Sequence, residues 1–168
     1  MAVTQVPAEQ TGGMILLSTT TLSGSSVSLS SIPQTYNHLQ LVIRNFLPST
    51  SVSLLLKVNG LTTDIYKTLG TFPNTNSNTY NDSQVTLASS PDETTQNGLV
   101  IFNLFDYKNT TTNKSFTVTS VVNMNDDATN VNFRNTMGAM GLTNAISSLQ
   151  LIVSSSFTSG TALLYGVK

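Results

Sequence analysis

The stretch Leu39-Gln40-Leu41-Val42-Ile43-Arg44 places three apolar side chains on one face of an extended chain. The stretch Val52-Ser53-Leu54-Leu55-Leu56-Lys57-Val58 does so with four, and Asn59-Gly60 follows it as a turn signal. Apolar residues at every second position are typical of a strand with one buried face. These stretches therefore predict two β-strands.

The same period recurs along the chain in short runs that are separated by turn residues. It predicts further strands at residues 14–19, 27–30, 64–69, 84–88, 99–107, 116–122, 146–153 and 161–167. Many short strands without crossover helices are typical of antiparallel sheets that pack face to face. The sequence thus predicts an all-β fold, a two-sheet antiparallel β-sandwich that is jelly-roll-like and has an extended N-terminal arm.

Residues 1–13 are predicted to form this arm, and residues 14–168 a single domain. The arm lacks alternation and contains a proline and two glycines, so it needs a surface to hold it, either a neighbouring subunit or its own domain. Its candidate assembly residues are Val3, Thr4, Gln5, Val6 and Pro7. The predicted core comprises Val27, Leu29, Leu39, Leu41, Ile43, Leu54, Leu56, Ile101, Phe116, Val118, Leu149, Leu151 and Leu164.

The polar surface is mostly neutral. Only 9% of residues are charged, whereas 22 are serine, 26 threonine and 17 asparagine. A net charge of −1 gives no electrostatic footprint for nucleic acid or an anionic membrane. The composition favours a β protein that packs against copies of itself or works outside the cell, over a cytosolic enzyme.

Catalytic motifs are scarce in the sequence. His38 is the single histidine and no cysteine occurs, so we expect no Ser-His-Asp triad and no zinc site. The segment Gly138-Ala139-Met140-Gly141 lacks the last glycine of a dinucleotide motif and is predicted to be a turn or bulge. We expect no cofactor, no metal and no enzymatic activity.

The carboxylates leave two less favoured functions open, a Ca²⁺ site and a glycosidase. Residues 123–127 could offer oxygen atoms to Ca²⁺, although Asp and Asn also cluster in turns for backbone reasons. Spacing does not exclude a glycosidase pair drawn from Asp64, Asp82, Asp92, Glu93, Asp106, Asp126 and Asp127.

A glycan-binding rim is a further possibility. Residues 72–83 are rich in Asn, Thr and Ser and are predicted to form a long exposed loop, with shorter loops at 92–97 and 109–113. An exposed aromatic ring beside amides suits a sugar, whereas Tyr107 and Tyr165 lie in apolar segments and are predicted to be core or rim residues. The candidate rim residues are Asn76, Asn78, Tyr80 and Asn109.

Four stretches in order resemble small virion structural proteins of tailed bacteriophages. They are Ser30-Ser31-Ile32-Pro33-Gln34-Thr35-Tyr36-Asn37-His38-Leu39-Gln40-Leu41-Val42-Ile43-Arg44, Lys57-Val58-Asn59-Gly60, Phe105-Asp106-Tyr107-Lys108-Asn109 and Ser159-Gly160-Thr161-Ala162-Leu163-Leu164-Tyr165-Gly166-Val167-Lys168. In that family an I-P-x-x-Y-x-x-L strand start comes early and an L-Y-G-[VI] strand comes late. Pro33 can end a preceding strand, Tyr36 can cover an edge, and Gly166 suggests a close backbone approach.

The resemblance implies a jelly-roll-like sandwich that decorates a capsid or forms part of a tail or fibre, without catalytic residues. We expect a capsid decoration or cement protein, as a homotrimer that binds the major capsid protein or another virion protein. Its place would be the outer virion surface after assembly in the host cytoplasm, and the lack of a signal-peptide pattern is in line with release by lysis. The alternative is a tail-fibre or tail-tip module that binds host glycans.

Overall fold

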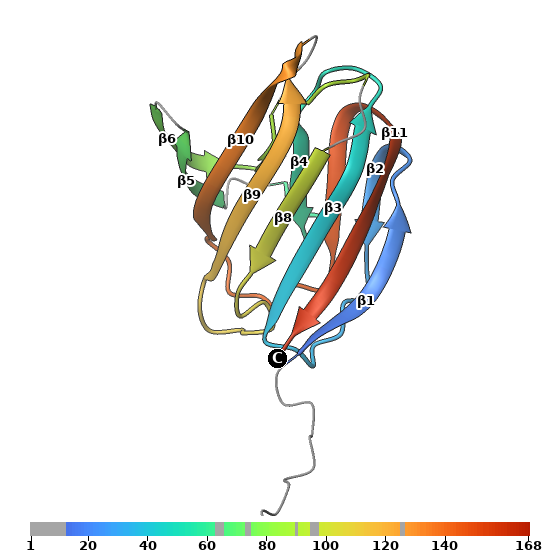
Figure 1. Cartoon of the computed structure of the whole chain (residues 1–168). Coiled ribbons are helices and arrows are strands. Elements are labelled where there is room, and N and C mark those ends of the chain that lie inside the picture. Colours follow the sequence, from blue (N-terminus) through green and yellow to red (C-terminus); the bar gives the residue numbers. More distant parts are fainter. Residues whose placement is uncertain (1–12, 63–65, 73–74, 90, 95–97, 125–126) are drawn as a thin grey trace, which may run out of the picture.

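The computed structural model describes residues 13–62, 66–72, 75–89, 91–94, 98–124 and 127–168, and it confirms the all-β class (Figure 1). Every pair of described strands is antiparallel. The strands are β1 (Met14–Thr21), β2 (Gly24–Leu29), β3 (His38–Pro48), β4 (Leu54–Val58), β5 (Tyr66–Phe72), β6 (Thr75–Asp82), β7 (Val85–Ala88), β8 (Gly98–Leu104), β9 (Lys114–Met124), β10 (Asp127–Met140) and β11 (Leu149–Val167).

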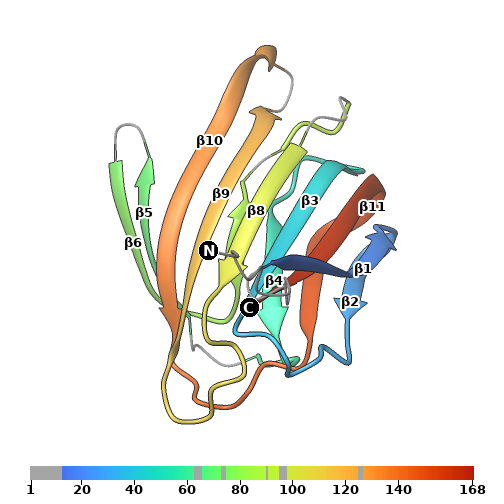
Figure 2. The same cartoon turned by 60° about the horizontal axis from the view of Figure 1, so that its bottom comes forward.

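The strands belong to one hydrogen-bonded sheet in the order β6-β5-β10-β9-β8-β3-β11-β4-β7, with β1 and β2 also paired to β11. This sheet folds over, so that β4 lies behind the layer formed by β10, β9, β8, β3 and the end of β11 (Figures 1 and 2). β7 packs against β8 and β9 across the interior. The predicted pair of sheets is thus joined by continuous hydrogen bonding into a nearly barrel-like shape.

β11 makes this joint because it runs through both layers. Its first residues, 149–152, pair with β2 on one side and β4 on the other, whereas residues 161–167 pair with β1 and β3. Register shifts between Phe157 and Thr161 mark the bend, which is how β-bulges turn a strand. Gly160 has φ 134°, and a Cβ on it would lie 2.8 Å from the Cα of Phe46, so only glycine fits there.

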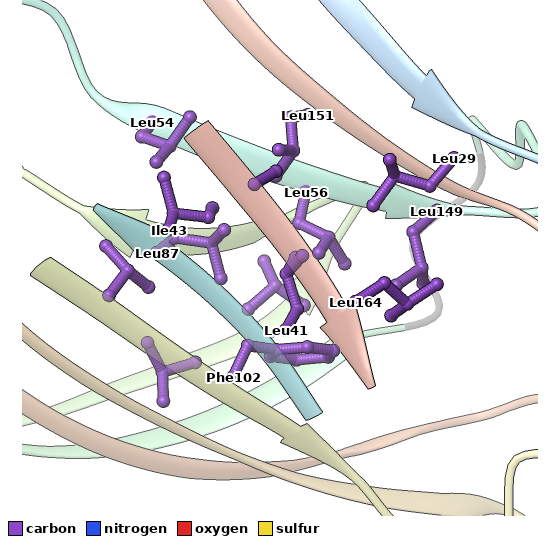
Figure 3. Packing of buried hydrophobic residues seen from close by; sticks show 14 of the residues in the cluster. Leu29, Leu41, Ile43, Leu54, Leu56, Leu87, Phe102, Leu149, Leu151 and Leu164 are labelled. Atoms are coloured by element: carbon purple, nitrogen blue, oxygen red, sulfur yellow. The ribbon is translucent and has the colours of Figure 1, made fainter. Parts of the chain in front are cut away.

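The hydrophobic core fills the space between the folded halves of the sheet (Figure 3). Leu54, Leu56 and Leu151 come from one half, while Leu41, Ile43 and Phe102 come from the other, and all six are inaccessible to solvent. Twelve of the thirteen predicted core residues are buried, namely Val27, Leu29, Leu39, Leu41, Ile43, Leu54, Leu56, Phe116, Val118, Leu149, Leu151 and Leu164. The prediction for Ile101 is wrong, because its side chain lies on the outer face of β8 while Val100 and Phe102 point inward.

Three local predictions are corrected by strand pairing. The segment predicted as a long loop at 72–83 contains β6, which pairs with β5. Gly138, Ala139 and Met140 form no turn, because they pair with both β9 and β5 inside β10. The strands predicted at 146–153 and 161–167 belong to the single strand β11, which begins at Leu149, so the prediction for residues 146–148 is wrong. In each case hydrogen bonding to a neighbour overrides a sequence rich in Asn, Ser, Thr or Gly, since β-propensity depends strongly on context.

Candidate functional site

Residues 32–37, 58–60 and 105–109 meet around residues 141–148, which connect β10 to β11. The amide of Ile32 donates to the carbonyl of Ser147 at 3.0 Å, and the amide of Ile146 donates to the carbonyl of Tyr107 at 2.8 Å. The amide of Asn59 donates to the carbonyl of Ser148 at 3.0 Å. We call residues 32–37, 58–60, 105–109 and 141–148 together the tied end.

Asn59 is the main polar clamp of the tied end. Its Oδ1 accepts hydrogen bonds from the amides of Ser147 and Ser148 at 2.8 and 3.2 Å, and its Nδ2 donates to the carbonyl of Ala145 at 2.9 Å. Its φ of 50° is in the left-handed region, where asparagine is tolerated. Asn59 therefore shapes the turn after β4 and also holds the connection to β11.

Tyr107 and Gln34 fasten the second side of the same connection. The buried hydroxyl of Tyr107 donates to the carbonyl of Pro33, and burial raises the pKa of this phenol. Nε2 of Gln34 donates to the carbonyls of Ile32 and Ile146, both at 2.9 Å. These contacts satisfy loop carbonyls from within the chain.

Tyr36 covers Gly166, which links the first and last of the four stretches. A Cβ added to Gly166 would lie 2.4 Å from Cγ of Tyr36, so the ring lies directly on the glycine backbone. The close approach expected at Gly166 is confirmed, and Tyr36 packs partly buried against the core as expected. An aromatic ring over a strand glycine restores packing that the missing side chain would have supplied.

Lys114 is a buried cation that the sequence did not single out. Its side chain is 0% exposed, and its Nζ donates to the carbonyls of Thr112 and Thr143 at 2.7 and 3.0 Å. Burial lowers the pKa of Lys114, and the negative charge of Asp106 opposes that shift. Lys114 joins the loop after β8 to residues 141–148 and is thus part of the scaffold.

An open groove of about 540 Å³ lies beside the tied end. Its wall offers a carboxylate, an ammonium, two amides and a hydroxyl, from Gln34, Asp106, Lys108, Asn109, Thr110 and Ala145. Oδ1 of Asn109 accepts hydrogen bonds from the amides of Thr111 and Thr112 at 2.7 and 3.1 Å. The predicted loop at 109–113 is confirmed, and the carbonyl oxygen of Asn109 serves to shape it.

His38 lies at the start of β3 and contacts the same loop. Its Nδ1 accepts a hydrogen bond from the amide of Asp106 at 3.1 Å, and its ring meets Phe105 edge-on with centroids 5.6 Å apart. Nδ1 lies 3.8 Å from Oδ1 of Asp106. The position of His38 at a strand edge, as predicted, makes it a structural partner of the turn at Asp106, which has φ 50°.

The described carboxylates outside the groove accept backbone hydrogen bonds, within a local turn for Asp82 and Asp92 and from a distant segment for Glu93. Oδ1 of Asp82 accepts from the amide of Gln84 at 3.3 Å, and Oδ1 of Asp92 accepts from the amide of Thr94 at 3.0 Å. Oε2 of Glu93 accepts from the amide of Ser51. The other members of the suggested glycosidase pairs, Asp64 and Asp126, lie outside the described residues, as do the side-chain contacts of Asp127.

The suggested cation site at 123–127 falls on a hairpin connection. Asn123 and Met124 end β9 and Asp127 begins β10, whereas residues 125 and 126 lie outside the described part of the chain. Within the described residues, no three His, Cys, Asp or Glu side chains gather as metal ligands would.

An apolar patch covers the outer face of β8, β9 and β10, which lie side by side in Figure 1. Leu99, Val121 and Phe133 form one row, because Leu99 pairs with Val121 and Val121 pairs with Phe133. Val131 and Met137 extend the row along β10, and these five side chains are 37–60% exposed. We call these five residues the outer apolar patch; exposed apolar groups that adjoin in this way mark interaction surfaces.

The rest of this face is polar but almost uncharged. Nε2 of Gln40 donates to Oδ1 of Asn103 at 2.8 Å, and Nδ2 of Asn103 donates to Oγ1 of Thr117 at 3.1 Å. These side chains form a hydrogen-bonded ladder across β3, β8 and β9. Among the described residues 40–44, 99–103, 117–121 and 131–137, Arg44 is the one outward-facing charge.

The sequence missed the outer apolar patch because β10 was not recognised as a strand. Val131, Phe133, Asn135 and Met137 follow a two-residue period, which is the signal that could have found it. Of the predicted rim residues, only Asn109 is placed beside the groove. The side chains of Asn76, Asn78 and Tyr80 in β6 lie outside what the structure describes, and so do the arm residues Val3, Thr4, Gln5, Val6 and Pro7.

The part of the chain that the structure describes holds no helix of the length and apolar character that a membrane span requires. No protein-family model and no curated protein sequence matches the chain.

Proposed function

We propose that this protein is a non-enzymatic structural protein of a phage virion, and that it works as a decoration or cement protein on the outer capsid surface. Its partner would be the major capsid protein or another virion protein. The outer apolar patch carries this proposal, because Leu99, Val121 and Phe133 form a continuous exposed row on a rigid sheet. A binding surface built on strands holds its shape better than one built on loops.

The chemistry of this face suits a neutral protein surface. Interface cores are depleted of charged side chains and enriched in aromatic residues and methionine, which matches Phe133 and Met137 beside Val121. The ladder of Gln40, Asn103 and Thr117 satisfies its polar groups within the face, so burial would leave few of them without partners. The nearby Arg134 does not add charge here, because its side chain is partly buried and donates to Thr136 and Ser89 on the other side of β10.

Docking on an assembled capsid would stabilise it by mass action, because a protein that binds only the intact lattice shifts the equilibrium towards that lattice. The arm, residues 1–13, would add contacts to the lattice or to a neighbouring copy. A truncation that starts at Met14 should then fold but bind capsids weakly. Equal binding by the truncated chain would exclude the arm from this role.

The patch is tested with capsids that lack this protein. Val121→Lys and Phe133→Ser should each abolish cosedimentation with such particles, since a single buried unpaired charge or a lost aromatic anchor costs several kcal/mol at about 25 °C. Ser28→Lys, which adds the same charge at an exposed position of β2, is the matched control and should bind normally. Normal binding of Val121→Lys would refute docking through this face.

Glycan binding in a tail-fibre or tail-tip module is the second candidate, and the groove beside Asn109 favours it. The polar groups of Asp106, Lys108 and Asn109 line this groove, where a sugar could make hydrogen-bonding contacts. Lys108→Ala and the Tyr80→Ala change in β6 should then each remove binding on a glycan array. Failure of the unchanged protein to bind any host-surface sugar would remove this candidate.

A further inference from the structure

β1 leaves one of its edges unpaired among the described strands, because it hydrogen-bonds only to β11. Its first three side chains are apolar and exposed, Met14 to 53%, Ile15 to 38% and Leu16 to 50%. Since successive side chains of a strand point to opposite faces, both faces of this segment are uncovered. The segment therefore presents main-chain hydrogen-bonding groups and apolar side chains at the same place.

This edge lacks the usual protection against strand addition. Natural proteins guard exposed edges with lysine, proline or an inward-pointing charge. No Asp, Glu, Lys or Arg occurs between residues 10 and 43, and β1 contains no proline. Its one irregularity is the register shift between Leu16 and Ser18, which follows the apolar residues. An unguarded edge of this kind is a template for another extended chain.

We propose that β1 pairs antiparallel with β1 of a second copy of this chain, so that two sheets join edge to edge in a two-fold dimer, which departs from the homotrimer expected from the resemblance. A two-fold contact is self-complementary and closes after two copies, so it gives a discrete particle instead of a fibre. β1 carries no charge with which a charged partner could form an ion pair. A second β1 strand is equally uncharged and apolar, so the two strands can pair without leaving a charge buried.

Pairing centred on Ile15 covers the exposed side chains. The two Ile15 side chains then meet on one face, while Met14 of each copy lies opposite the partner's Leu16 on the other face. Directly opposed apolar side chains in a sheet contact each other and stabilise the pair.

The chain itself supplies a sharp test because it contains no cysteine. Cα atoms of directly opposed antiparallel residues are about 4.5–5.5 Å apart, which suits a disulfide. Ile15→Cys should thus form an intermolecular disulfide rapidly on mild oxidation of the purified full-length protein. Ser26→Cys, at an exposed position of β2 on another sheet edge, is the matched control and should stay unlinked.

Solution mass gives the second readout and uses no virion component. Sedimentation equilibrium should show twice the 17.9 kDa of one chain for the unchanged protein, and a single chain for Ile15→Lys with unaltered circular dichroism and unfolding midpoint. Val121→Lys, in the outer apolar patch, should remain dimeric. Three results would each overturn the inference: a monomer at every concentration, a trimer, or equal crosslinking of Ser26→Cys. A protein that fails to bind capsids but remains dimeric would contradict the proposed function and not the β1 dimer.

Discussion

At the tied end, the loop carbonyls and amides form hydrogen bonds with the side chains of Asn59, Gln34, Tyr107 and Lys114. The ring of Tyr36 packs on Gly166. On the outer apolar patch, the large side chains of β8, β9 and β10 touch solvent and no other layer. The difference teaches that the residues of the tied end hold the scaffold together, whereas the exposed apolar side chains lie on the neighbouring strands β8, β9 and β10. Changes at the two regions should therefore have opposite effects on stability and on binding.

The largest loss of stability is expected for Asn59→Ala. It removes four side-chain hydrogen bonds and leaves alanine, which tolerates φ 50° less well than asparagine does, and together these should cost about 3 kcal/mol of unfolding free energy. Urea denaturation measures this loss. Asn59→Gly relieves the backbone strain and should recover about 1 kcal/mol of it. If Asn59→Ala unfolds like the unchanged protein, the tied end is not held as described.

Gly166→Ala should cost about 2 kcal/mol, because the new methyl group displaces the ring of Tyr36. The double change Gly166→Ala with Tyr36→Ala should cost less than the sum of the two single changes, since the clash is then absent. A double-mutant cycle by chemical denaturation gives the coupling. Strict additivity would show that the ring does not lie on the glycine.

Tyr107→Phe should cost about 1–2 kcal/mol near neutral pH, because the carbonyl of Pro33 loses its donor. The raised pKa of Tyr107 adds a pH dependence, because the folded protein keeps the phenolic proton more tightly than the unfolded chain does. This contribution to stability is complete below the ordinary tyrosine pKa of 10.0 and is lost as pH rises above it. The stability gap between the two proteins should thus narrow in alkaline solution. A gap that is constant up to the highest usable pH would contradict the buried hydroxyl.

The smallest effect on stability is expected in the outer apolar patch. Val121→Thr keeps the shape of an exposed strand residue and should change the unfolding free energy by less than about 0.5 kcal/mol. The same change should measurably weaken capsid binding, which the tied-end variants retain while they stay folded. A thermal melt checks the predicted stability of Val121→Thr, and a binding assay checks its predicted loss of capsid binding. A large drop in stability would mean that Val121 is buried against other side chains.

Much of the fold follows from period-two patterns, because a half-buried strand must alternate. Leu39, Leu41 and Ile43 were therefore predicted as core, and the all-β class with them. β6 and β10 were missed because their stability comes from the strands beside them, which single-sequence patterns do not contain.

The contacts at the tied end could be predicted from the sequence less well than the core could. Tyr36 and Gly166 were expected to cover an edge and to allow a close approach, but nothing in the sequence indicates that they touch, since they are 130 residues apart. The burial of Lys114 and the bonds of Asn59 also depend on where residues 141–148 return in space. Ile101 was misplaced because both faces of β8 carry apolar residues there, and the pattern does not reveal which face lies inside.

The central place of β11 has a consequence for how the protein is made. The chain leaves the ribosome from its N-terminus, and β11 is synthesised after all the strands that it joins. β1, β2, β3 and β4 are thus complete long before the strand that pairs with each of them exists. The sheet can therefore form only after β11 has been synthesised, and until then β1, β2, β3 and β4 lack the strand that pairs with them.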